Sequence, residues 1–155
     1  PLTTTLLNIE SATVLVIVDD KVQDLEGLLG RLQSDVDLLV LDETQEPFAQ
    51  INQAISTEPN YLGVVMVAAA ASDAIYIAGR WVDKHYLMQH RESVALFGQN
   101  FMKRSQLMLL TTNSIDNSKG AGLLALFTGL SQLEISAHGE AEHHYLAFNE
   151  FVGFF

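Results

Sequence analysis

Hydrophobic residues are concentrated in short runs separated by amphipathic segments. The runs are residues 12–18 (ATVLVIV), 36–42 (VDLLVLD), 62–67, 106–111 (QLMLLT) and 133–136 (LEIS). Such continuous apolar runs are typical of strands that are buried on both faces of a parallel sheet. Between them, apolar positions recur at helical spacing. The predicted helices cover about 22–32, 46–56 and 84–102, and a last one follows the polar residues 113–118 and ends near Leu130.

Strands that alternate with helices predict an α/β fold. We expect a three-layer sandwich with a mostly parallel five-stranded sheet of order 2-1-3-4-5, numbered along the chain, and with right-handed crossovers. The segment AIYIAGRW after the third strand predicts a hairpin that ends in a tight turn. The length favours one α/β domain over residues 1–155, which we interpret as part of a longer chain.

Composition narrows the range of partners. Nineteen acidic residues against eight basic ones give a net charge of -11, which repels a phosphate backbone and argues against nucleic-acid binding. The apolar runs are shorter than the ~20 residues of a membrane-spanning helix, so no membrane insertion is expected. The chain has no cysteine, which excludes thiolate catalysis and cysteine-ligated metal.

In open parallel sheets, ligands bind beyond the carboxyl ends of the strands. Here that edge carries a candidate ligand-binding rim, formed by Asp19, Asp20, Thr111, Thr112 and Asn113. The simpler interpretation is structural. Acidic residues offset a helix macrodipole, and Thr and Asn side chains satisfy turns and helix caps.

Several segments together carry a family resemblance. TVLVIVDDKVQDLEGLLGRL, VDLLVLDETQEPFAQINQAI, IYIAGRWV and LMLLTTNSIDNSKGAGLLALFTGLSQLEISA follow one another in the order and spacing of an uncharacterised bacterial domain family. That family occurs near the N-termini of very large secreted, repeat-containing adhesin-like proteins. Its layout is similar to that of caspase-like cysteine peptidases, so the resemblance implies a caspase-like or flavodoxin-like sheet and a secreted or cell-surface location.

The resemblance also implies that a catalytic dyad has been lost. Caspase-like enzymes place a His-Gly pair after the third strand and a Cys after the fourth, where imidazole and thiol meet. In the alignment that the resemblance implies, Ala69 and Ala70 occupy the His-Gly positions, and Thr112 occupies the position of the cysteine. We expect Ala69 and Thr112 to lie close together at one rim, with neither the catalytic base nor the thiol nucleophile present. The predicted function is a non-catalytic accessory or interaction domain, a pseudoenzyme without a cofactor or metal.

Two alternatives from other functional classes remain open. One is a cytoplasmic phosphoreceiver-like signalling module that uses Asp19 and Asp20, although the third strand ends in alanines where an aspartate would be needed. The other is a hydrolase with unusual residues, such as Thr112 with His138. Partners are expected to be an unknown protein or the rest of the parent chain. The aromatic tail HHYLAFNEFVGFF could support a homo-oligomer.

Remaining candidates have weaker support. His138, His143 and His144, with Glu140 or Glu142, match no metal-ligand spacing and are interpreted as a solvated loop. Trp81, the only tryptophan, is interpreted as a packing anchor under the hairpin. The phosphate-binding motifs GxxxxGK[ST] and GxGxxG after a strand are absent from the sequence.

Overall fold

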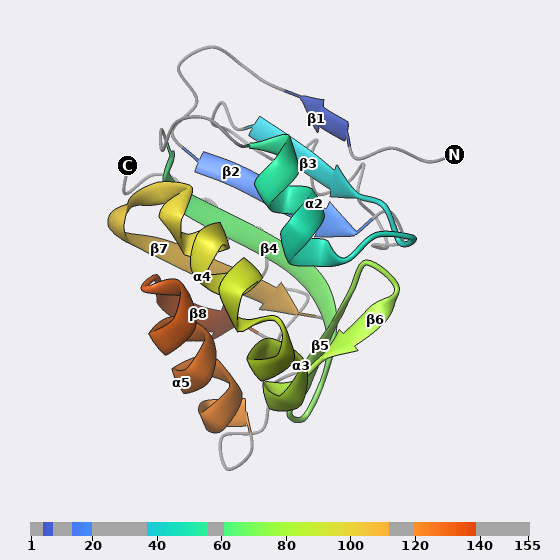
Figure 1. Cartoon of the computed structure of the whole chain (residues 1–155), viewed down its shortest axis with the longest axis vertical. Helices are drawn as coiled ribbons and strands as arrows, with labels where there is room; N and C mark the ends of the chain where they lie inside the picture. The colour runs from blue at the N-terminus through green and yellow to red at the C-terminus, as the bar shows by residue number, and fades with distance from the viewer. Residues whose placement is uncertain (1–4, 8–13, 20–36, 56–60, 112–119, 139–155) are drawn as a thin grey trace.

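A computed structural model describes residues 5–7, 14–19, 37–55, 61–111 and 120–138 (Figure 1). Its strands are β1 (Thr5–Leu7), β2 (Val14–Asp19), β3 (Asp37–Leu41), β4 (Tyr61–Ala71), β5 (Ala74–Ile77), β6 (Arg80–Val82), β7 (Phe101–Thr111) and β8 (Glu134–His138). Its helices are α2 (Pro47–Ala54), α3 (Lys84–Gln89), α4 (Arg91–Gln99) and α5 (Gly120–Ser131).

The sheet is mostly parallel. β3, β2, β4, β7 and β8 lie side by side in that order, and each neighbouring pair is parallel. This is the predicted order 2-1-3-4-5. The full sheet differs from the prediction by one edge strand, because β1 pairs antiparallel with β3. The hairpin after the third predicted strand is also confirmed, since β5 and β6 continue antiparallel from the end of β4.

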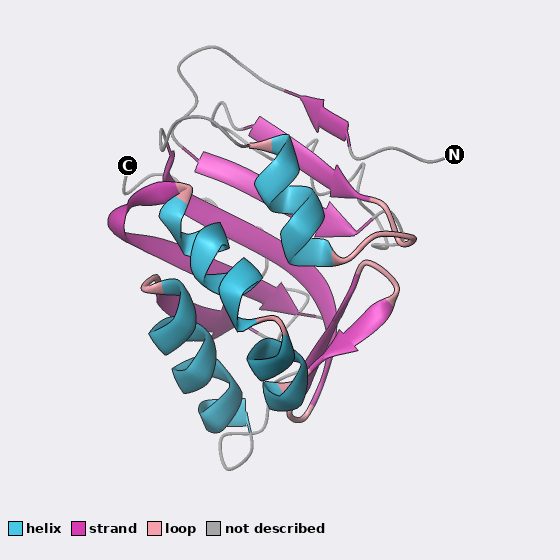
Figure 2. Cartoon of the chain, viewed as in Figure 1, coloured by secondary structure: helices cyan, strands magenta, loops and turns pink. Residues whose placement is uncertain are grey.

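Helices α2, α4 and α5 lie on one face of the sheet, and α3 packs beside the β5–β6 hairpin and α5 (Figure 2). Their apolar sides meet the buried central strands, and every residue of β2 is buried. Phe48, Phe97 and Phe127, one each from α2, α4 and α5, pack edge to face or tilted with ring centroids 5.6–6.2 Å apart. The α/β class is confirmed and is consistent with a three-layer sandwich. The helix predicted over 22–32 lies outside the described residues.

The single helix predicted over 84–102 is wrong. α3 ends at Gln89, and α4 begins at Arg91 after a corner at His90 (φ -112°, ψ 26°). The following strand β7 begins at Phe101, five residues earlier than predicted. The chain therefore turns twice where the apolar spacing suggested one element.

Capping fixes where two of the helices begin. Glu46 precedes α2 and accepts hydrogen bonds from the backbone N–H groups of Phe48 (3.1 Å) and Ala49 (2.9 Å). Pro47 follows it, at a position that needs no intrahelical donor. Asp83 caps α3 by accepting from the Tyr86 N–H at 2.8 Å. Within the described part of the chain, no helix is long and apolar enough to cross a membrane.

Candidate functional site

The predicted rim is described only in part. Asp19 ends β2 and Thr111 ends β7, and both are buried. Asp20, Thr112 and Asn113 lie outside the described residues. The structure therefore places two of the five rim residues at the carboxyl ends of their strands.

The strand that carries Ala69 and the strand that ends before Thr112, the two predicted dyad positions, are neighbours. β4 and β7 are parallel, and their last paired residues are Ala68 and Thr111. Ala69 is the next residue of β4 and is half-buried. Thr112 lies outside the described residues, so the closeness of Ala69 and Thr112 stays a prediction.

The alanine run is a strand rather than a rim loop. After Ala68, β4 leaves β7 and pairs antiparallel with β5, in the register Ala69–Tyr76, Ala70–Ile75 and Ala71–Ala74. Alanine has a low intrinsic preference for strands, so the pairing with the hairpin determines the conformation here. The structure thus joins Ala69, the predicted position of the dyad histidine, directly to the hairpin.

Asp19 binds the hairpin. Asp19 is 4% exposed, and its carboxylate accepts a 2.9 Å hydrogen bond from the Ala78 backbone N–H. A buried carboxylate needs such donors, because burial removes its hydration. Asp19 thereby fastens the end of β2 to a turn that lies 59 residues later in the chain.

The turn that Asp19 holds has an uncommon backbone. Ala78 and Gly79 have φ angles of 52° and 76° between the paired residues Ile77 and Arg80. Positive φ at both central residues is what a two-residue hairpin turn of type I′ requires. Glycine adopts this conformation readily, whereas alanine is strained in it.

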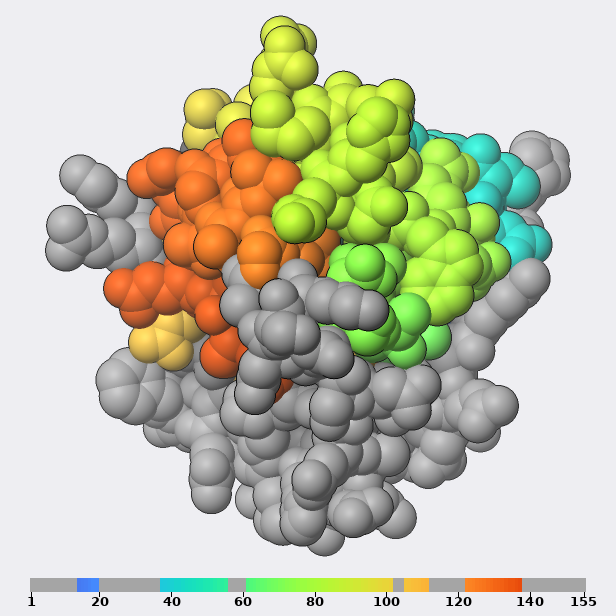
Figure 3. Space-filling model, turned by 90° about the horizontal axis from the view of Figure 1, so that it is seen from below, coloured from blue at the N-terminus to red at the C-terminus, as the bar shows by residue number. Residues whose placement is uncertain are grey.

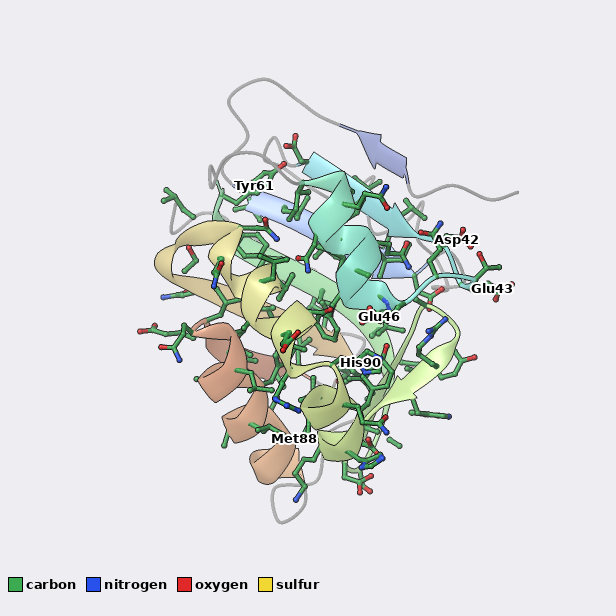
Figure 4. The ribbon with its side chains drawn as sticks, in the orientation of Figure 1. Asp42, Glu43, Glu46, Tyr61, Met88 and His90 are labelled. Atoms are coloured by element: carbon green, nitrogen blue, oxygen red, sulfur yellow. The ribbon has the colours of Figure 1, made fainter. Side chains whose placement is uncertain are left out.

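Contacts with the loop between β3 and α2 hold the same turn. Arg80 donates to the Ala78 carbonyl (3.1 Å) and to the Glu43 carbonyl (3.5 Å). A Cβ at Gly79 would lie 2.9 Å from the Glu43 carbonyl oxygen, so the two backbones are in close contact. Figure 4 shows Glu43 in this loop, beside the hairpin.

Asp42 organises that loop. Its Oδ1 accepts from the Thr44 backbone N–H and hydroxyl (both 2.9 Å), and its Oδ2 accepts from the Gln45 side chain (3.1 Å). Gln50 of α2 bonds both the N–H and the carbonyl of Asp42. The hydrogen bond from the Thr44 N–H, followed by the side-chain bonds of Thr44 and Gln45, holds the pKa of Asp42 below its usual value against the opposing effect of burial.

The half-buried side chain of Tyr86 lies near Arg80 of the hairpin. The Tyr86 hydroxyl is shielded from solvent and makes no hydrogen bond with the described residues. Burial raises the pKa of Tyr86, and the nearby charges of Glu46 and Arg80 act on it in opposite directions. The His90 ring stacks on Tyr86 at 4.0 Å, and its Nδ1 lies 3.0 Å from the Tyr86 carbonyl oxygen. This cluster could not be predicted from the sequence, because its members come from the N-cap of α2, from β6, from α3 and from the α3–α4 corner.

The outward face of the hairpin carries aromatic side chains. Tyr76 pairs with Ala69 on one side and with Trp81 on the other, so the three residues form a row on one face. The rings of Tyr76 and Trp81 meet edge to face at 5.1 Å. We call Ala69, Tyr76 and Trp81 the aromatic row. Trp81 is 52% exposed, so its interpretation as an anchor under the hairpin is wrong.

The opposite face of the hairpin supplies the packing that was assigned to Trp81. Ile75, Ile77 and Val82 are buried there with Leu87 of α3. Seen from below, α3 lies between the hairpin and α5 on the molecular surface (Figure 3). Strict alternation in AIYIAGRWV could have placed Tyr76 and Trp81 on the outer face from sequence alone.

No three histidine or acidic side chains among the described residues are grouped so that they could hold a metal ion. The side chain of His138, and residues Glu140, Glu142, His143 and His144, lie outside the described part. A surface hollow of about 210 Å³ on α2 is lined by Gln45, Gln50, Gln53 and Ala54, and these side chains bring no titratable group or strong nucleophile.

The comparisons place the chain in a family without assigning an activity. The family model described as "Domain of unknown function (DUF4347)" matches residues 15–144. No curated protein matches the chain, and no solved structure does.

Proposed function

Because the chain belongs to the DUF4347 family, a domain of unknown function, we propose its role from its own residues. It is a non-catalytic interaction domain, a degenerate relative of caspase-like peptidases. It serves as an accessory module of a bacterial adhesin-like protein that is secreted or held at the cell surface, and it binds its partner through the aromatic row.

The exposed side chain of Trp81 carries this proposal. A tryptophan that is 52% exposed and braced by Tyr76 offers a large apolar surface in a fixed orientation. Residues of this kind dominate the binding energy of protein interfaces. Ala69 extends the row with a small side chain, next to which a partner can approach the sheet closely.

The lack of a base at Ala69 supports the non-catalytic role. Alanine cannot accept a proton from a nucleophile, and β4 holds Ala69 in a ladder with β5. The nearest described acidic group on the adjoining strand β2, Asp19, is bound to the hairpin backbone. This arrangement favours partner binding over acyl transfer.

The burial of Asp19 and the alanines at the end of β4 weigh against the phosphoreceiver-like alternative. A phosphoreceiver needs an accessible acidic pair and an aspartate at the end of the third strand. Asp19 is buried beneath the hairpin turn, and β4 ends in Ala70 and Ala71.

Turnover measurements test the non-catalytic role. The domain is incubated with fluorogenic peptide and ester libraries, with and without divalent cations, and no turnover above a buffer blank is expected. Hydrolysis that disappears in Thr112→Ala would establish the hydrolase instead. Acetyl phosphate with Mg²⁺, followed by intact mass measurement, should leave the mass unchanged.

Partner capture tests the aromatic row. Binding partners cross-linked to the wild-type domain are identified by mass spectrometry and then reconstituted from purified components. Trp81→Ala should weaken the reconstituted complex at least tenfold, about the loss expected for a central aromatic residue. Leu96→Ala is the matched control, because Leu96 is 50% exposed but lies on α4. Equal affinity of the two variants would refute the assignment of the surface.

A further inference from the structure

The hairpin turn at Ala78 and Gly79 covers the carboxyl edge of the sheet at the point where strand order reverses. β2 lies between β3 and β4, so chain connections run in opposite directions from this point. Doubly wound sheets bind ligands there. In this protein the end of β2 is instead capped by its own chain, through the bond between Asp19 and the Ala78 N–H.

Two features of this closed contact are unfavourable. Ala78 is held in the left-handed region at φ 52°, which costs an L-residue free energy. The Tyr86 hydroxyl is shielded from solvent near the polar side chains of Arg80 and Glu46, but it makes no hydrogen bond of good geometry with the described residues. Strain and unsatisfied groups of this kind persist only where the surroundings impose them.

The hydrogen bonds that join the turn to neighbouring segments include the Asp19–Ala78 bond and a bond from Arg80 to the Glu43 carbonyl oxygen, which is long at 3.5 Å. The remainder of the hairpin is held more firmly, because Ile75, Ile77 and Val82 are buried on its inner face. The turn can therefore separate from the loop between β3 and α2 while the hairpin stays packed.

We propose that the turn from Ile77 to Arg80 is a self-occluding latch with a populated open state. In the open state the Asp19–Ala78 bond is broken, Ala78 leaves the left-handed region, and water reaches the Tyr86 hydroxyl. The carboxyl end of β2 is then uncovered. This inference is independent of the partner surface, since the latch acts at the buried edge and not at Trp81.

Amide hydrogen exchange, followed by NMR, tests the latch directly. The Ala78 amide is buried and bonded to Asp19, so it exchanges only when the turn opens. We expect its exchange to be faster than that of the Met66 amide in central β4, and nearly independent of low urea concentrations, as for local opening. Equal protection of Ala78 and Met66, with the same urea dependence, would overturn the proposal.

Variants give the direction of each contribution. Ala78→Gly relieves the backbone strain and should slow opening by about fivefold to tenfold, after correction for intrinsic exchange rates. Tyr86→Phe removes the unsatisfied hydroxyl and should also slow exchange of Ala78. Asp19→Asn weakens the bond and should accelerate it, while Leu96→Ala should leave it unchanged. If Ala78→Gly and Tyr86→Phe fail to slow exchange, the closed turn is not the strained state and the latch is refuted.

Discussion

Gly98 shows how a single missing methyl group sets the packing of two helices. A Cβ at this position in α4 would lie 1.8 Å from the Ser131 carbonyl oxygen at the end of α5, and that neighbour is backbone. We therefore expect Gly98→Ala to destabilise the domain by about 3 kcal/mol or more, at or above the usual range for overpacking. Urea denaturation followed by circular dichroism measures the loss.

Gly129 is the matched control for this substitution. It lies in α5, it is exposed, and an added Cβ would meet no atom within 4 Å. Gly129→Ala should raise stability by about 0.5–1 kcal/mol, because alanine restricts the unfolded chain and favours helix. Similar effects of the two substitutions would show that α4 and α5 do not approach as described.

The carboxylate of Asp42 should make the free energy of unfolding depend on pH in the acid range. Its pKa is lower in the folded protein than the ~3.9 of an unfolded chain, so its contribution is present above that value. The contribution is lost as the pH falls through the folded pKa. The stability difference between wild type and Asp42→Asn should therefore shrink between about pH 5 and pH 2 in urea titrations. A difference independent of pH, with Asp73→Asn as the charge-matched control, would contradict the Asp42 network.

Among the elements, α2 depends on a cap that sequence analysis did not identify. Glu46 accepts two N–H groups of the first turn of α2. Glu46→Ala should cost about 1 kcal/mol, the usual loss when an N-cap acceptor is removed. Gln53→Ala, at an exposed position of the same helix, should have little effect in thermal denaturation. Equal shifts would show that the cap contributes nothing.

The elements that were predicted correctly from the sequence are the strands whose formation depends mainly on burial of a continuous apolar run. The buried runs became β2, β3, β4, β7 and β8. The general preference for right-handed crossovers between parallel strands left few orders to choose from. β1 has three residues and no periodicity of its own, so its pairing with β3 depends on tertiary contact. The corner at His90 was not predicted, because the helical spacing of apolar residues continues from α3 into α4.

The candidate site was less predictable for a physical reason. Asp19 was expected to face a ligand or a helix, but its partner Ala78 is 59 residues away and offers only a backbone N–H. Ala69 was singled out only by the family resemblance, whereas the placement of Tyr76 beside it and of Trp81 beside Tyr76 follows from cross-strand register. The sequence therefore indicates which residues are present at the strand ends, but their contacts depend on strand pairing that the sequence alone does not reveal.

For the whole molecule, two tyrosines whose hydroxyl groups are shielded from solvent couple stability to alkaline pH. Burial, followed by the hydrogen bond to Asp37, raises the pKa of Tyr61, which donates to that carboxylate. Burial also raises the pKa of Tyr86. Because both folded pKa values exceed the ~10 of an unfolded chain, their stabilising contributions are complete below that pH and are lost as it rises.

The two tyrosines should nevertheless respond differently to removal of the hydroxyl. Tyr61→Phe leaves Asp37, which is 3% exposed, without this donor and should cost about 1–3 kcal/mol at pH 7. Tyr86→Phe removes an unsatisfied group and should leave stability at pH 7 equal or higher.

Each variant should lose stability less steeply than wild type above about pH 10, in urea titrations paired with phenolate absorbance. Wild-type slopes in both variants would mean that the unfolded chain, and not these buried hydroxyls, sets the alkaline limit; a large loss at pH 7 for Tyr86→Phe would mean that its hydroxyl has a partner in the folded state.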